Sequence, residues 1–148
     1  MPLSDIEDII QHNPDSIVIV DEAYIDFGGM SALPLIEKYD NLIVVQTFWK
    51  SRSMAGMRIG FAISNPNLIR VLNDCKFSFN SYTMNQVTIA AGAASVADRA
   101  YFQNTVAKIV KTREASKKVM AELGFQFPDS QSNFLFVTHP KYSAKELY

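Results

Sequence analysis

Four side chains in two short segments of this sequence have the types and the spacing to act together chemically. Asp21 directly follows an apolar run, with Tyr24 three residues later, and Lys50 lies in a loop rich in small residues, eight positions before Arg58. A partly desolvated lysine amine can be neutral and attack a carbonyl carbon. An arginine fork suits a phosphate, which it binds through two parallel hydrogen bonds. A lysine in such a loop is more often a solvated surface residue, so the chemistry depends on whether these side chains meet.

Two buried strands are expected to bring the two segments together. Ile17–Val20 and Leu42–Val45 are continuous aliphatic runs, typical of strands that are covered on both faces. Asp21 follows the carboxyl end of the first run, and the loop of Lys50 follows the second. Open α/β sheets place their ligands at that edge. The sequence therefore predicts that Asp21 and Lys50 face one pocket.

The rest of the chain is expected to supply helices around this sheet and two further strands. The prediction uses the spacing of apolar residues together with proline, glycine and asparagine turn signals. Helices are expected at Ser4–His12, at Ala32–Tyr39, from Asn65 and Pro66 onward, at Met84–Ala97 and at Ala100–Leu123, and strands at Arg58–Ile63 and Asn133–Val137.

The long helix is expected to lead into a second, smaller domain. Gly124 is placed to end it, and Ser143 with Glu146 resembles the capping box of a last helix. Strand-helix alternation gives way to consecutive helices near residue 83, so we assign residues 1–99 to part of a large domain and 100–148 to a connecting helix and the beginning of a small one. The basic residues of the long helix are expected to form a solvated face: Lys108, Lys111, Arg113, Lys117 and Lys118.

Composition restricts the class of protein. The 148 residues are 48% hydrophobic and 20% charged, as in an ordinary globular domain, with no run long enough to cross a bilayer. A net charge of -1 with dispersed basic residues argues against nucleic-acid binding. His12 and His139 lie far apart without partners at ligand spacing, so no metal site is expected. The single cysteine, Cys75, and a start without secretory character favour the cytoplasm.

Together, Asp21, Tyr24, Lys50 and Arg58 form the set needed to hold pyridoxal 5′-phosphate. The lysine amine condenses with the aldehyde to a Schiff base. An aspartate beside the ring nitrogen keeps the ring protonated, and a protonated ring stabilises a carbanion at the substrate's Cα. The tyrosine hydroxyl can bind the phenolic oxygen. Each residue also has a simpler interpretation, in which Asp21 caps a turn, Tyr24 is a packed aromatic and Arg58 pairs with a nearby carboxylate.

Two longer motifs carry a resemblance to a known family. Val20-Asp-Glu-Ala-Tyr-Ile-Asp-Phe27 and Gln46-Thr-Phe-Trp-Lys-Ser-Arg-Ser-Met-Ala-Gly-Met-Arg-Ile-Gly-Phe-Ala62 closely resemble histidinol-phosphate aminotransferases, which are fold-type I, aspartate-aminotransferase-like pyridoxal-phosphate enzymes. The resemblance extends over nearly the whole chain, including Ser81–Asn85, Asp98–Phe102 and Ser130–Leu135. It implies an α/β fold: part of the large domain, with a mostly parallel sheet and flanking helices, leading into a smaller C-terminal α+β domain.

The resemblance also implies a role for each side chain at the site. Lys50 would be the Schiff-base lysine and the general acid/base of the proton shift. Asp21 would be the partner of the pyridine nitrogen, Tyr24 that of the phenolic oxygen, and Arg58 a phosphate ligand.

One residue departs from the family pattern. The family usually has a serine immediately before the lysine, where its hydroxyl helps bind the phosphate, and this chain has Trp49 there. An indole has one donor and no hydroxyl. Thr47 or Ser51 could supply the missing group, and we count Thr47 among the expected cofactor ligands.

Two functions of different classes follow. The first is pyridoxal-phosphate-dependent transamination of an amino acid such as histidinol phosphate with 2-oxoglutarate, by a longer, homodimeric enzyme of which this chain is a weakly active or inactive piece. An aromatic amino acid or another donor fits equally. The second is a non-catalytic module that self-associates through an exposed sheet edge and apolar surface. A mononucleotide-binding module fits less well, because no Gly-rich turn joins a strand to a helix.

Overall fold

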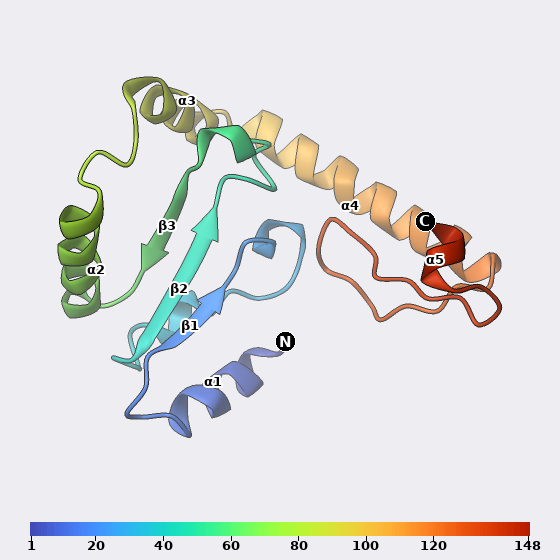
Figure 1. Cartoon of the computed structure of the whole chain (residues 1–148), viewed down its shortest axis with the longest axis horizontal. Coiled ribbons are helices and arrows are strands. Elements are labelled where there is room, and N and C mark those ends of the chain that lie inside the picture. Colours follow the sequence, from blue (N-terminus) through green and yellow to red (C-terminus); the bar gives the residue numbers. More distant parts are fainter.

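A small sheet forms the centre of the computed structural model, which describes residues 1–148. Its three strands are β1 (Val18–Asp21), β2 (Leu42–Thr47) and β3 (Gly60–Ile63), in the order β1-β2-β3. β1 and β2 are parallel, with Asp21 opposite Val45. β3 returns antiparallel to β2 (Figure 1). The two predicted strands are therefore neighbours, and their carboxyl ends lie at one edge of the sheet. The prediction that both are covered on both faces is wrong for the first run, because Ile17 and Ile19 are 55% and 62% exposed and only one face of β1 packs on the core.

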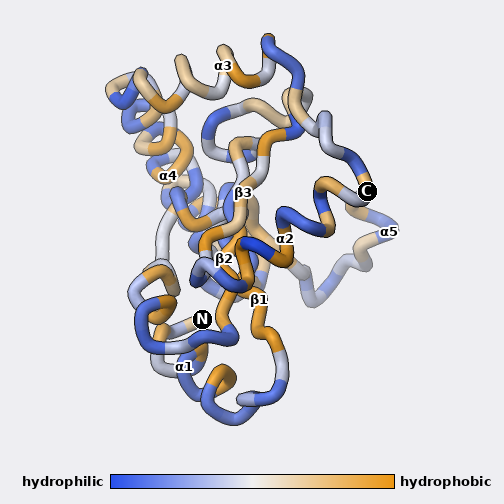
Figure 2. The backbone as a smooth tube through the Cα atoms, turned by 90° about the vertical axis from the view of Figure 1, so that its left-hand side faces the viewer, coloured by the Kyte–Doolittle hydropathy of each residue, from blue (hydrophilic) through white to orange (hydrophobic).

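The hydrophobic core lies between the sheet and the first helix. Helix α1 (Leu3–Gln11) packs beside β1 (Figure 1), and its apolar stripe follows helical spacing. The strands themselves are the most continuously hydrophobic part of the chain (Figure 2). The core cluster consists of Ile6, Ile10, Ala32, Leu35, Leu42 and Val44.

Three further helices follow the sheet. They are α2 (Pro66–Phe79), α3 (Gln86–Ala97) and α4 (Arg99–Glu122), and α4 extends away from the strands toward the C-terminus (Figure 1). The side chains of Asn65, Asn85 and Asp98 each accept a backbone N–H at the start of one helix. Gly124 ends α4 with a φ of 85°. None of the helices is both long enough and apolar enough to cross a membrane.

The last residues form a short helix, α5 (Ala144–Leu147), with the predicted capping box. The backbone N–H of Ser143 donates to Oε2 of Glu146 at 2.7 Å. Because this charge-assisted bond favours the ionised carboxylate, the pKa of Glu146 is lowered. The prediction of a helix start at this position is confirmed.

Two predicted elements do not form. In place of a helix at Ala32–Tyr39 there is a single 3₁₀ turn, Leu33–Leu35. The N–H groups of Leu35 and Ile36 bind the carbonyls three residues back, at 2.9 and 3.1 Å, which closes the tighter turn. The strand predicted at Asn133–Val137 is wrong as well. The hydroxyls of Ser130 and Ser132 bind the carbonyl of Phe134 instead, and only an isolated bridge, Gln126 to Thr138, forms nearby.

The prediction that the basic residues of α4 form a solvated face is also wrong for two of them. The side chains of Arg113 and Lys117 are only 9% and 14% exposed. Both point toward other segments of the chain and make polar contacts there. Sequence spacing on one helix could not reveal those partners.

A buried carboxylate fixes the carboxyl end of β1. Glu22, which is 6% exposed, accepts hydrogen bonds from the N–H of Ala32 at 2.6 Å, the hydroxyl of Ser31 at 2.7 Å and the amide of Gln46 at 2.9 Å. These donors come from the following loop and from β2. Glu22 therefore joins the ends of both strands and the segment that enters the core.

We expect Glu22→Ala to lower the free energy of unfolding by about 3 kcal/mol, because the donors it binds would lose a charged acceptor. The change is measured by urea denaturation followed by circular dichroism. Glu37→Ala, which truncates an exposed glutamate, is the matched control and should change stability by less than about 0.5 kcal/mol. Equal midpoints for the two variants would contradict the role of Glu22.

Candidate active site

Lys50 and Tyr24 meet at the carboxyl edge of the sheet. The Nζ atom of Lys50 lies 5.2 Å from the centroid of the Tyr24 ring, within reach of a cation–π contact. Tyr24 lies just before the 3₁₀ turn Ile25–Phe27, and Lys50 lies in the loop after β2. The ring of Tyr24 also packs edge-to-face on Phe134, with centroids 5.4 Å apart. Three segments that are distant in sequence thus converge on Tyr24.

Asp21 lies at the same edge, at the end of β1. Its Oδ1 accepts the N–H of Ala23 at 2.9 Å, which is the turn-capping contact. A carboxylate has two oxygens and accepts through both. Asp21 can therefore shape the turn and still receive a proton donor from a ligand through Oδ2.

Arg58 does not pair with a carboxylate. It occupies the left-handed region, with a φ of 58°, and its guanidinium carbon lies 3.7 Å above the centroid of the Trp49 ring. Its Nη1 approaches the carbonyl of Ala55 at 3.4 Å. A guanidinium stacked on an aromatic face keeps its in-plane donors available, so the pair forms a cationic platform one residue from Lys50.

Two buried polar atoms near Lys50 have no hydrogen-bond partner. They are Oγ1 of Thr47 and Nε1 of Trp49. Buried polar groups are nearly always satisfied, so each exception needs an explanation, and a bound ligand or ion is one. Of the two hydroxyls that could replace the family's serine, Thr47 is the unengaged one, because the hydroxyl of Ser51 donates to Asp26.

Arg52 is a residue of this loop that sequence reasoning did not single out. It donates to the carbonyl of Ser95 at 2.6 Å and lies 4.0 Å from the centroid of the Phe102 ring. These contacts anchor the Lys50 loop to α3 and α4. Its position two residues after Lys50 was visible in the sequence, but its partners lie more than forty residues away.

A cavity lies beside Asp21 and Tyr24. It has a volume of about 420 Å³ and opens between the end of β1 and the segment 128–136. Lys50 is not among its lining residues, so the predicted pocket is lined by Asp21 but not by Lys50. Asp21, Tyr24, Ser130 and Phe134 are among its lining residues. The size and the mixture of apolar walls with a few polar groups are typical of small-molecule sites.

Comparison with known proteins assigns the chain to a family. The profile of aminotransferase class I and II matches residues 1–148. The chain belongs to the aminotransferase class I and II family. Among curated members, histidinol-phosphate aminotransferase of Lactococcus lactis subsp. cremoris strain MG1363 is 56% identical over 146 residues, which is 99% of this chain and 41% of that protein. The same enzyme of Brachyspira hyodysenteriae is 54% identical over 149 residues, 100% of this chain and 42% of that protein.

A solved family structure has the same fold. Histidinol-phosphate aminotransferase of Sinorhizobium meliloti, in complex with pyridoxal-5′-phosphate, matches with a TM-score of 0.83 and 28% identity, covering 95% of this chain and 39% of that chain. This confirms the α/β fold and the family resemblance. The chain spans about two fifths of the length of the family members it matches.

We expect Trp49→Phe to leave stability unchanged or to raise it by about 1 kcal/mol, because it removes an unpaired buried donor and keeps an aromatic face under Arg58. Urea denaturation followed by circular dichroism measures this, since Trp49 is the only tryptophan and fluorescence would be lost. Trp49→Ala is the control and should destabilise through lost packing. A loss as large in Trp49→Phe as in Trp49→Ala would show that the indole N–H has a partner.

Proposed function

We propose that this chain carries the cofactor-anchoring part of a pyridoxal-phosphate-dependent aminotransferase. In the intact enzyme it would transaminate an amino acid such as histidinol phosphate with 2-oxoglutarate, and the chain alone would be weakly active or inactive. The observation that carries the proposal is the position of the Lys50 amine over Tyr24, at the sheet edge where Asp21 also lies. The relatives above support the donor, since they are named for histidinol phosphate.

The residues present fit the cofactor. The unpartnered hydroxyl of Thr47 and the stacked guanidinium of Arg58 suit an anion, and the remaining oxygen of Asp21 suits a protonated ring nitrogen. When bound, pyridoxal phosphate supplies an aldehyde that condenses with amines and a ring that accepts the electron pair released at the substrate's Cα. We assign Asp21, Tyr24, Thr47, Lys50 and Arg58 to its binding.

Lys50 has the central role in this assignment. Its amine would act as a nucleophile when neutral and would carry a proton on Nζ when charged. The Tyr24 ring face attracts the ammonium and holds the side chain in place. The Tyr24 hydroxyl would donate a hydrogen bond to a phenolate oxygen, and Asp21 would hold a proton on the ring nitrogen by charge-assisted hydrogen bonding.

Trp49 changes the phosphate end of the site. A serine hydroxyl there could rotate toward an anion. The indole N–H of Trp49 is buried instead, and the face of its ring stacks against Arg58. Thr47 would then be the hydroxyl donor to the phosphate in place of the serine. In this arrangement Arg58 would make the main charged contact with the phosphate.

The wider assignments follow from the family. We propose that residues 1–99 belong to the cofactor-binding large domain, and that residues 100–148 form the connecting helix and the beginning of the small domain. The substrates would be an amino acid and a 2-oxo acid, and the enzyme would be a homodimer. It would lie in the cytoplasm, where thiols such as that of the unpaired Cys75 stay reduced.

We expect Lys50 to be the lysine that is labelled when the chain is incubated with pyridoxal phosphate and reduced with borohydride. Peptide mass spectrometry locates the added group. Lys50→Ala should lose this label, and Lys108→Ala, which removes an exposed lysine of α4, should keep it. Equal labelling of wild type and Lys50→Ala would contradict the assignment.

A second candidate function, self-association, is favoured by the exposed surface of α2. No residue of this helix is buried, and Val71, Phe77 and Phe79 are 51%, 61% and 95% exposed. A helix that leaves large apolar side chains exposed and buries no residue usually packs on another protein surface. We propose that a second copy of this chain covers it, whether or not the site is loaded.

We expect the chain to form dimers or larger species in size-exclusion chromatography with light scattering. Replacing both Phe77 and Phe79 with glutamate should shift it toward the monomer, because charges would be buried at the contact. Tyr148→Glu adds a charge at an exposed aromatic just after α5 and should leave the mass unchanged. A wild-type chain that stays monomeric at high concentration would contradict the proposal.

A further inference from the structure

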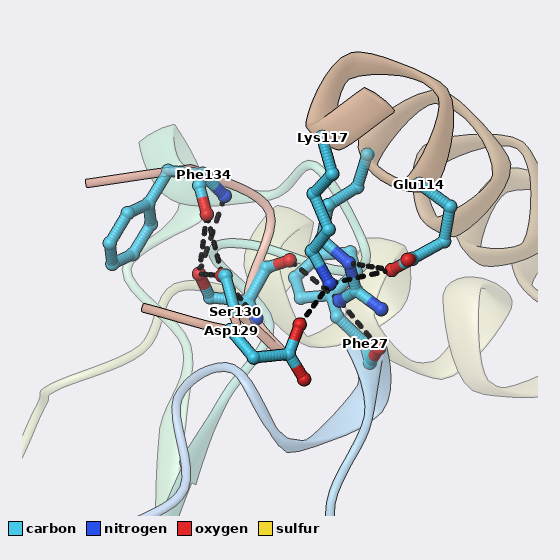
Figure 3. Close-up of polar contacts among 8 residues, drawn as sticks. Phe27, Glu114, Lys117, Asp129, Ser130 and Phe134 are labelled. Carbon is cyan, nitrogen blue, oxygen red and sulfur yellow. Dashed lines mark hydrogen bonds and ion pairs between the residues drawn. The ribbon is translucent and has the colours of Figure 1, made fainter. Parts of the chain in front are cut away.

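Arg113 of α4 is almost enclosed, with only 9% of its side chain exposed. Its Nη1 atom donates to two backbone carbonyls, that of Phe27 at 3.0 Å and that of Ser132 at 2.9 Å (Figure 3). Phe27 lies in the turn Ile25–Phe27, Arg113 in α4, and Ser132 in the segment that follows α4. One guanidinium nitrogen therefore bridges backbone segments that have no strand or helix in common.

The two carbonyls belong to segments that carry an aromatic ring of the candidate site. The N–H of Phe27 donates to the carbonyl of Tyr24 at 3.1 Å, closing the turn that follows Tyr24. The hydroxyl of Ser132 accepts the N–H of Phe134 at 3.3 Å. Arg113 thus binds, on either side, the segment that holds Tyr24 and the segment that holds Phe134.

The charge of Arg113 is balanced close by. Its Nε donates to Oε1 of Glu114 at 2.8 Å. The same oxygen accepts from Lys117 at 2.9 Å, and Lys117 also contacts Asp129 at 2.6 Å (Figure 3). The hydrogen bonds from Lys117 and then Arg113 lower the pKa of Glu114, so this carboxylate remains ionised beside the guanidinium at neutral pH.

We propose that Arg113 is a positioning residue, which sets the edge-to-face packing of Phe134 on Tyr24 and so holds the Tyr24 ring beneath Lys50. Packed aromatic pairs are directional, so the two segments that carry the rings must keep a fixed relative orientation, and Arg113 binds both of them. The guanidinium supplies two N–H groups in one plane at the end of a long stem. A lysine is shorter and cannot satisfy both carbonyls and Glu114 together.

The significance of Tyr24 as a cofactor ligand rests on the proposed function, but the positioning claim does not. The test therefore uses the full chain without cofactor. Nuclear Overhauser cross-peaks between the rings of Tyr24 and Phe134 are measured by NMR, with Tyr24→Phe used to assign the tyrosine signals. Wild type should show these cross-peaks, and Arg113→Lys, which keeps the charge, should lose them.

Lys117→Met is the matched control, because it removes the neighbouring cation of the same helix and its contact with Asp129 but leaves both carbonyl contacts of Arg113. It should keep the cross-peaks. Thermal unfolding of every variant shows whether a lost signal follows lost stability. Arg113→Gln provides a second, uncharged replacement in case Arg113→Lys does not fold.

Retention of the cross-peaks in a folded Arg113 variant would overturn the proposal, as would their equal loss in Lys117→Met. Failure of both Arg113 variants to fold, with Lys117→Met folded, would overturn it too, because Arg113 would then hold the whole fold and not the aromatic pair. The cofactor adds an independent measurement: borohydride labelling of Lys50 should be slower in Arg113→Lys. An absence of labelling in wild type counts against the proposed function alone.

Discussion

The parallel pairing of β1 with β2 is the constraint on which the candidate site depends. Its register places Asp21 opposite Val45, and the N–H of Glu22 continues the ladder to the carbonyl of Val45 at 2.8 Å. The carboxyl ends of both strands are thereby brought to one edge, so that the turn of Tyr24 and the loop of Lys50 leave the sheet side by side. A shift of one residue would turn every side chain of the shifted strand to the other face.

The return of the chain through β3 completes that edge. The N–H of Phe48 donates to the carbonyl of Ile59 at 3.1 Å, and the N–H of Met54 donates to the carbonyl of Phe48 at 3.1 Å. The loop is therefore closed by its own backbone, and Trp49 and Arg58 come into stacking contact across it. The position of Arg58 follows from the antiparallel turn and its left-handed backbone.

The sequence was sufficient for what depends on local pattern. Continuous aliphatic runs predicted β1 and β2, and asparagine or proline before apolar spacing predicted α2, because propensity and packing agree there. It was insufficient where distant groups compete for the backbone: serine hydroxyls replaced the predicted strand at 133–137. Residue types also pointed to Asp21, Tyr24 and Lys50 as candidate site residues, but not to Arg113, whose partners lie 86 and 19 residues away. Side-chain to backbone contacts of that range leave no periodic signal.

A crystal structure of the chain soaked with pyridoxal phosphate would show whether this sheet edge holds the cofactor through Lys50. We expect continuous electron density from Nζ of Lys50 to the cofactor ring, with the Asp21 carboxylate at hydrogen-bonding distance from the ring nitrogen. Density attached to another lysine, or ordered cofactor bound away from Asp21 and Tyr24, would contradict it.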